Sequence, residues 1–216
     1  MLDHAGDAFE HRTVYECLGY ELSHAGQAYV LSSGLWHGAE RRFTKGIDSM
    51  ISALKPSGIR LADWNTTDDE ATYNAECCKG TGFVLMDKKL VHYGGQRSKF
   101  EFCDFLHVGQ RTLFCAKIPT RSSDCSHLVE QCKRTLELFF SSDAGFRNEA
   151  IKVFSKQQSK LNTTWLKNRP KPGDWKICLV LMGRAVDKLP LFARCSIARL
   201  AKYCDERGHP FHVQSV

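Results

Sequence analysis

The sequence predicts an α/β protein built around a mixed sheet, and three observations support this class. Strand-like segments over 83–91, 99–106 and 112–118 are joined by short glycine-containing turns, which is typical of an antiparallel meander. A nearly all-apolar segment, 175–182, fits a strand covered on both faces. A helix follows it and leads to a final strand over 211–216, and this strand–helix–strand unit favours parallel pairing.

The N-terminal part predicts a smaller unit. A short meander is expected over 13–37, followed by a helix over 39–55 whose apolar residues recur at helical spacing. Pro56 and Gly58 end this helix. We therefore expect two regions: residues 1–58, a meander and helix packed on the main domain, and residues 59–216, an α/β domain.

Four further helices are expected in the main domain. The first covers 71–78, after an acidic turn at 65–70 that is suited to capping it. The others cover 123–140, 143–154 and 191–207. The element order is therefore helix, three-stranded antiparallel meander, helix, strand, helix, strand.

Composition describes a globular chain. Of 216 residues, 43% are hydrophobic and 25% charged, and no apolar run approaches the roughly 18 residues that span a bilayer. The polar first residues, MLDHAGDAFEHR, do not read as a secretory signal, so a cytoplasmic location is expected. The ten cysteines contain no CxxC pair, which favours reduced, mostly buried thiols over zinc ligands.

Charge is distributed unevenly along the chain. Residues 1–107 contain 11 Lys+Arg and 15 Asp+Glu, whereas residues 108–216 contain 19 and 9, so the balances are −4 and +10. A basic half facing an acidic half suits a polyanion held near metal-binding carboxylates. A solvated surface accounts for the same charges equally well.

Asp104 and Lys117 are the best candidates for a chemical site. Metal-dependent phosphodiester cleavage needs carboxylates for a hard cation such as Mg²⁺ and a positive charge near the phosphate. Asp104 would hold Mg²⁺, and Lys117 would stabilise charge or position water. The further acids considered for catalysis or metal binding are Glu101, Asp87, Glu76 and Glu70.

The helix after Lys117 offers polar residues at one-turn spacing, Ser123, His127 and Gln131. His127 is the histidine candidate for catalysis, and a cysteine–histidine pair with Cys115 or Cys125 is a weaker alternative. The expected contacts to nucleic-acid phosphates are Ser123, Gln131, Arg147, Lys152, Lys156 and Lys160, and basic residues recur as far as 171.

The predicted element order resembles the core of the restriction-endonuclease-like fold, the PD-(D/E)xK nucleases. That motif has Asp on one strand and Asp/Glu-x-Lys on the next, where this chain has Asp104 and Cys115-Ala116-Lys117. A thiol is a poor Mg²⁺ ligand. Either another acid replaces Cys115, namely Glu101, Glu76 or Glu70, or the site departs from the standard nuclease.

The chain also resembles DUF6119, a sporadically distributed bacterial family of unknown function. The resemblance lies in 29–36 (YVLSSGLW), 70–74 (EATYN), 84–90 (VLMDKKL), 100–106 (FEFCDFL), Lys117, 126–128 (SHL), Gln131, 146–147 (FR) and 189–192 (LPLF). Family members are usually longer at the N-terminus and carry His-Val-Lys where this chain has 115–117. The resemblance implies a bacterial, often mobile-element-associated protein and supplies no activity.

Together these features predict a nucleic-acid-acting domain that cleaves phosphodiesters with Mg²⁺, in phage or mobile-element defence. A non-catalytic nucleic-acid-binding module on the same fold is the alternative that Cys115 favours. A third is a protein-interaction or assembly domain, in which part of the apolar content forms the interface of a homo-oligomer.

Overall fold

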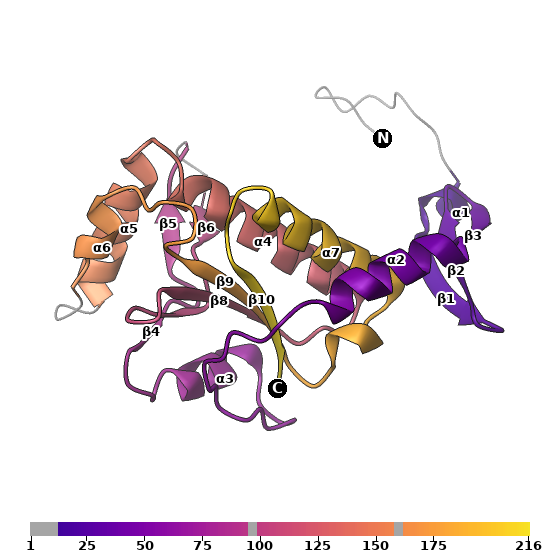
Figure 1. Cartoon of the computed structure of the whole chain (residues 1–216), viewed down its shortest axis with the longest axis horizontal. Coiled ribbons are helices and arrows are strands. Elements are labelled where there is room, and N and C mark those ends of the chain that lie inside the picture. Colours follow the sequence, from indigo (N-terminus) through magenta and orange to yellow (C-terminus); the bar gives the residue numbers. More distant parts are fainter. Residues whose placement is uncertain (1–12, 95–98, 158–161) are drawn as a thin grey trace.

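The computed structural model describes residues 13–94, 99–157 and 162–216, and it shows a mixed α/β protein. Its central sheet has five strands in the order β10-β9-β8-β7-β4. Helices α4 and α7 cover one face of this sheet, and α3 lies against the other (Figure 1). The strands are β4 (Phe83–Leu85), β7 (Phe105–His107), β8 (Thr112–Lys117), β9 (Lys176–Leu181) and β10 (Phe211–Ser215).

The pairing in this sheet changes at β8. β4, β7 and β8 are antiparallel neighbours, whereas β8, β9 and β10 run parallel. The change follows from the connections, because a short turn joins β7 to β8 while helices α4 and α7 precede β9 and β10. The expected α/β class with a mixed sheet is thus confirmed.

Two of the expected strands are each broken in two. In place of 83–91 the chain forms β4 and β5 (Leu90–His92), and in place of 99–106 it forms β6 (Lys99–Glu101) and β7. β5 and β6 pair with each other in a separate two-stranded ladder. The meander is therefore a hairpin that leaves the central sheet halfway along its length.

Local contacts explain the break. Lys89 N donates to Met86 O at 2.9 Å, closing a turn in which Lys88 adopts a positive φ of 58°. On the facing strand, Phe102 packs against Phe139 of α4, with ring centroids 5.3 Å apart. The Oγ1 of Thr135 donates to Phe102 O at 2.6 Å. The hairpin therefore bends from the sheet toward α4.

The expected helices are present within a few residues of their predicted ends. The Asp69 carboxylate accepts from Thr72 N at 2.8 Å and caps α3, as the acidic turn indicated. The short α1, α6 and η1 were not expected. The helices are α1 (Val14–Cys17), α2 (Arg41–Ser52), α3 (Glu70–Cys77), α4 (Ser122–Phe139), α5 (Gly145–Gln157), α6 (Thr164–Lys167), η1 (Val186–Lys188, a 3-10 helix) and α7 (Leu191–Asp205).

The N-terminal meander is a separate antiparallel sheet at one end of the molecule (Figure 1). It consists of β1 (Tyr20–His24), β2 (Gln27–Ser32) and β3 (Leu35–Gly38), and α2 connects it to the body by packing on α7. The division into regions 1–58 and 59–216 stays a prediction, and residues 1–12 lie outside the described part of the chain.

The core is divided between the two faces of the central sheet. One set of buried side chains lies between the sheet and α4, α5 and α7, and a smaller set lies under α3. All ten cysteines are free, and most are buried, as expected for reduced thiols. Among the described helices, none is long and apolar enough to cross a membrane.

Candidate functional site

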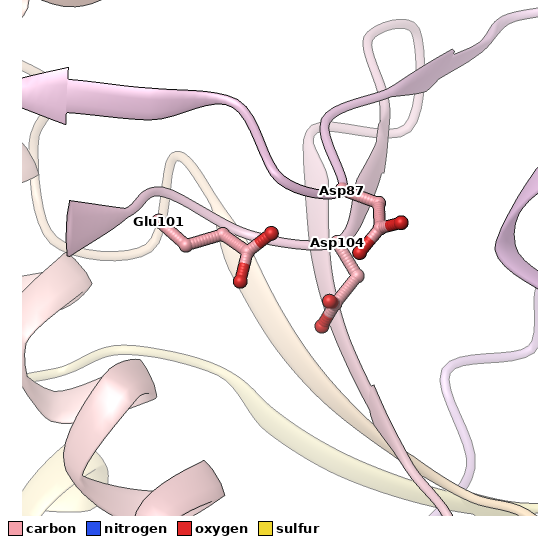
Figure 2. Close-up of side chains that lie close together, drawn as sticks. All are labelled: Asp87, Glu101 and Asp104. Carbon is pink, nitrogen blue, oxygen red and sulfur yellow. The ribbon is translucent and has the colours of Figure 1, made fainter. Parts of the chain in front are cut away.

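Three carboxylates meet where the hairpin bends (Figure 2). Asp87 lies in the turn after β4, Glu101 is the last residue of β6, and Asp104 lies between β6 and β7. Each residue has one carboxylate oxygen that lies within 4.8 Å of a carboxylate oxygen of each of the other two residues. In the part of the chain that the structure describes, this is the one group of three acids, histidines or cysteines with metal-ligand spacing.

Asp104 is the most buried of the three, with 7% of its surface exposed. Its carboxylate accepts a hydrogen bond from Ala116 N on β8 at 2.8 Å. In an intact ladder a neighbouring strand would supply the acceptor for that N–H, and here the side chain supplies it because the hairpin has left the sheet. The bend therefore holds the Asp104 carboxylate against β8.

The pKa values of this cluster reflect its burial and its shared negative charge. Burial, with the Glu101, Asp87 and Glu70 carboxylates adding to it, raises the pKa of Asp104 to about 8 against the lowering effect of Ala116 N–H. Burial also raises the pKa of Glu101, with Asp87 adding to it and Lys88 N–H and Lys117 opposing. Three ionised carboxylates this close repel one another, and a bound cation would relieve that repulsion.

Lys117 ends β8 and pairs with Glu70 in the first turn of α3. Its Nζ lies 2.8 Å from Glu70 Oε2, and Glu70 Oε1 accepts from Ile118 N at 3.1 Å. Lys117 lowers the pKa of Glu101, and Glu70 raises that of Asp104, so the pair acts electrostatically on the carboxylate cluster. Glu70 is one of the acids that the sequence offered in place of Cys115.

Cys115 itself faces the core. It is fully buried, and its thiol hydrogen-bonds with Cys132 of α4. Glu76, another acid expected to bind metal, instead pairs with Lys79 on the exposed side of α3. The acids that gather beside Lys117 are thus Glu70 and the three-carboxylate cluster.

The expected nucleic-acid contacts are scattered. Ser123 and His127 are exposed on α4, while Gln131 has a buried Nε2 that finds no hydrogen-bond partner in the described part of the chain. Lys152 lies 2.5 Å from Glu149 on α5, where Lys156 is also exposed. Lys160 lies outside the described residues.

Arg147 has a different environment from the one expected for a phosphate contact. Only 3% of its surface is exposed, and its Nη1 donates to Ser141 O at 2.6 Å and Phe139 O at 3.4 Å. These are carbonyls at the C-terminal end of α4, where a cation is stabilising. We therefore leave Arg147 out of the nucleic-acid surface.

Sequence reasoning gave no site role to Asn74, a fully buried residue of α3 whose amide oxygen and nitrogen both lack a hydrogen-bond partner among the described residues. Asn74 lies one helical turn after Glu70, on a helix face that also contains the buried Tyr73 and Cys77. The sequence signal that could have identified Asn74 is a polar residue that lies among apolar residues at helical spacing.

Fold and site together define a mixed α/β protein with a partly buried carboxylate cluster and a lysine at the end of a central strand. The chain belongs to the family described as "Family of unknown function (DUF6119)", whose model matches residues 1–216. This confirms the resemblance found in the sequence. No curated protein and no solved structure matches the chain.

Proposed function

We propose that this protein hydrolyses phosphodiester bonds of nucleic acid with the help of a divalent cation. The observation that carries the proposal is the carboxylate cluster of Asp87, Glu101 and Asp104, whose oxygens lie within 4.8 Å of one another. The ion pair of Lys117 and Glu70 lies within electrostatic reach of this cluster. Carboxylates together with a lysine are the groups that this chemistry requires.

Mg²⁺ suits the donor set. All three side chains offer oxygen, which hard cations prefer, and burial raises the pKa of Asp104 and Glu101, so a cation bound there would favour their ionised forms. When bound, the ion would supply a Lewis acid and lower the pKa of a water molecule.

The residues of the chain have separate parts in this proposal. Lys117 places a positive charge beside the cluster, where it stabilises a phosphate oxygen that gains charge. Glu70 positions the Lys117 amine through its 2.8 Å contact. The Ala116 N–H holds the Asp104 carboxylate in one orientation.

The order of elements supports the nuclease interpretation. Helix α3, the antiparallel β4, β7 and β8, then α4 and β9 occur in the order of the restriction-endonuclease-like core that the sequence resembles, with β5 and β6 inserted after β4 and α5 and α6 inserted after α4. The exposed Ser123, His127, Lys152 and Lys156 are the proposed backbone contacts. A cytoplasmic role in phage or mobile-element defence remains part of the proposal.

Cleavage of labelled DNA and RNA, single- and double-stranded, tests the proposal. We expect Mg²⁺- or Mn²⁺-dependent cleavage that a chelator abolishes and that Lys117→Ala and Asp104→Asn each reduce by at least about 100-fold. Lys202→Ala is the control for loss of a surface lysine, because the exposed Lys202 of α7 pairs with Glu206 and is none of the proposed contacts. Folded, nuclease-free protein that cleaves none of these substrates with either metal would contradict the proposal.

One observation favours a non-catalytic nucleic-acid-binding module as the second candidate. The position of the usual acid in Asp/Glu-x-Lys is Cys115, which is buried against Cys132. This candidate predicts binding that weakens steeply with salt, survives Lys117→Ala and is reduced by loss of the exposed lysines. Fluorescence anisotropy with a labelled oligonucleotide at several salt concentrations separates it from the enzyme.

A further inference from the structure

A second candidate site lies away from the carboxylate cluster, between the C-terminal ends of α4 and α7 and the loop before β9. It is a pocket of about 340 Å³, within the size range of small-ligand sites. Its polar and aromatic lining includes Phe140, Arg169, Tyr203, Arg207 and His209.

Two arginines at this pocket are held by contacts within the chain. Arg169 Nε donates to Phe140 O at 2.8 Å, and the two terminal nitrogens of its guanidinium have no hydrogen bond to another described residue. The Arg207 guanidinium lies 3.8 Å from the centre of the Tyr203 ring, and its Nη1 lies 3.4 Å from Tyr203 O and 3.9 Å from the Glu206 carboxylate. Preorganised guanidinium groups are suited to binding phosphate oxygens in pairs.

An aromatic pair lines the same pocket. The rings of Phe140 and His209 have centroids 4.0 Å apart, and the residues are 8% and 7% exposed. His209 Nδ1 is buried and has no hydrogen-bond partner among the described residues. A buried polar atom without a partner is costly, and His209 lines the pocket, so a ligand or water that reached this nitrogen would remove that cost.

Glu137 adds an acceptor at the rim. Its carboxylate accepts from the Tyr203 hydroxyl at 3.2 Å and retains lone pairs for a second donor. The pocket therefore combines a cationic side, a stacked aromatic pair and hydrogen-bonding groups of both kinds. A simple inorganic anion would use only the arginines.

We propose that this pocket binds a nucleoside monophosphate, with its phosphate at Arg169 and Arg207 and its base beside Phe140 and His209. Every residue of this site lies outside the carboxylate cluster, so the inference does not depend on the proposed cleavage activity. It gives a specific role to Arg169, one residue of the basic segment that ends at residue 171.

Isothermal titration calorimetry of the whole chain tests the proposal with three probes: nucleoside 5′-monophosphates, the matching nucleosides and inorganic phosphate. We expect at least one monophosphate to bind at least about tenfold more tightly than its nucleoside and than phosphate. Arg169→Gln and Arg207→Gln should each weaken that binding by about tenfold or more. Lys171→Gln is the matched control, because Lys171 is an exposed cation of the same loop and does not line the pocket.

A second variant tests the binding of the base separately from the binding of the phosphate. His209→Phe keeps a ring against Phe140 and removes the unpaired nitrogen, so it should weaken the monophosphate severalfold and leave phosphate binding unchanged. It also keeps the test valid if Arg169→Gln, which loses a bond to Phe140 O, fails to fold.

Three results would overturn the inference: no monophosphate binding at millimolar concentration, phosphate binding as tightly as the monophosphate, or equal losses in Lys171→Gln and both arginine variants. Asp104→Asn should leave monophosphate binding unchanged, which distinguishes failure here from failure of the cleavage proposal.

Discussion

Position along one strand decides the different roles of Cys115 and Lys117. Side chains two residues apart point to the same face of a strand, so the two differ in how far along β8 they lie. Cys115 lies inside the sheet and is fully buried beside Cys132. Lys117 lies at the strand end, where its long side chain reaches Glu70. The position at which the nuclease motif carries an acid is therefore buried in the core of this protein. The acid that pairs with Lys117 comes from α3 instead.

The buried side chain of His209 gives a prediction about how stability depends on pH. Burial, and secondarily the charge of Arg207, lowers the pKa of His209 below its usual 6.5. The pocket also brings Arg169 and Glu137 near this ring. Below about pH 6.5 the unfolded chain binds a proton that folded His209 does not, so stability falls as the pH falls.

Urea unfolding of the wild type and of His209→Phe from pH 7.5 to 5 checks this. We expect the unfolding free energy of the wild type to fall more on acidification, by at most about 1.4 kcal/mol per pH unit for one proton. His212, whose pKa is lowered too, keeps part of the slope in the variant. The same change of unfolding free energy with pH in the wild type and in His209→Phe would contradict the prediction.

At the scale of elements, the bent hairpin assembles the carboxylate cluster. A straight pair of strands over 83–91 and 99–106 would alternate Glu101 and Asp104 between opposite faces. The turn at Lys88 and the departure of the strand at 102–104 remove that alternation and bring both oxygens together with Asp87. The break in regular structure is therefore what brings the three carboxylates of the proposed metal site together.

Gly183, in the turn after β9, can be compared with Gly58, which follows α2. Gly183 has a φ of 75°, and a Cβ there would lie 2.3 Å from Cζ3 of Trp64. Gly58 has nearly the same φ, 76°, and a Cβ added there would have nothing within 4 Å. Gly58→Ala should lower the unfolding free energy by about 1 kcal/mol through backbone strain, and Gly183→Ala by at least about 2 kcal/mol because the indole must also move.

Chemical denaturation of both glycine variants measures the difference. In a Trp64→Leu background the difference in unfolding free energy between the two glycine variants should be smaller, because a smaller side chain leaves room for the new methyl group. Equal losses for the two glycine variants would mean that the Trp64 contact has no energetic effect.

For the whole molecule, Glu21 connects the N-terminal sheet to the body. Its carboxylate accepts from Phe192 N at the start of α7, at 2.8 Å, and from the hydroxyl of Ser122 at the start of α4. An anion near helix N-termini is stabilising. The sheet around it leaves several large side chains exposed, among them Tyr20, Leu35 and Trp36, so few apolar contacts replace this polar connection.

Glu21→Gln should therefore loosen the N-terminal sheet without unfolding the core. We expect faster amide hydrogen exchange in β1–β3, equivalent to about 1–2 kcal/mol, and unchanged protection in β8 and β9. Glu40→Gln removes the same charge at the start of α2, where the side chain makes no capping bond, and should have no such effect. Unchanged exchange in Glu21→Gln would show that apolar contacts alone hold the sheet.

The sequence alone was sufficient for the α/β class, for most helices, for the buried strand at 176–181 and for Asp104 and Lys117 as candidates. Periodicity and turn residues predict the elements, and the chemistry of a carboxylate and a lysine on neighbouring predicted strands selects Asp104 and Lys117. Tertiary structure alone decided the bend, the choice of Glu70 as the partner of Lys117, and the pocket at His209. Glu70 and Lys117 are 47 residues apart, and a local pattern carries no information about which residue lies across such a distance.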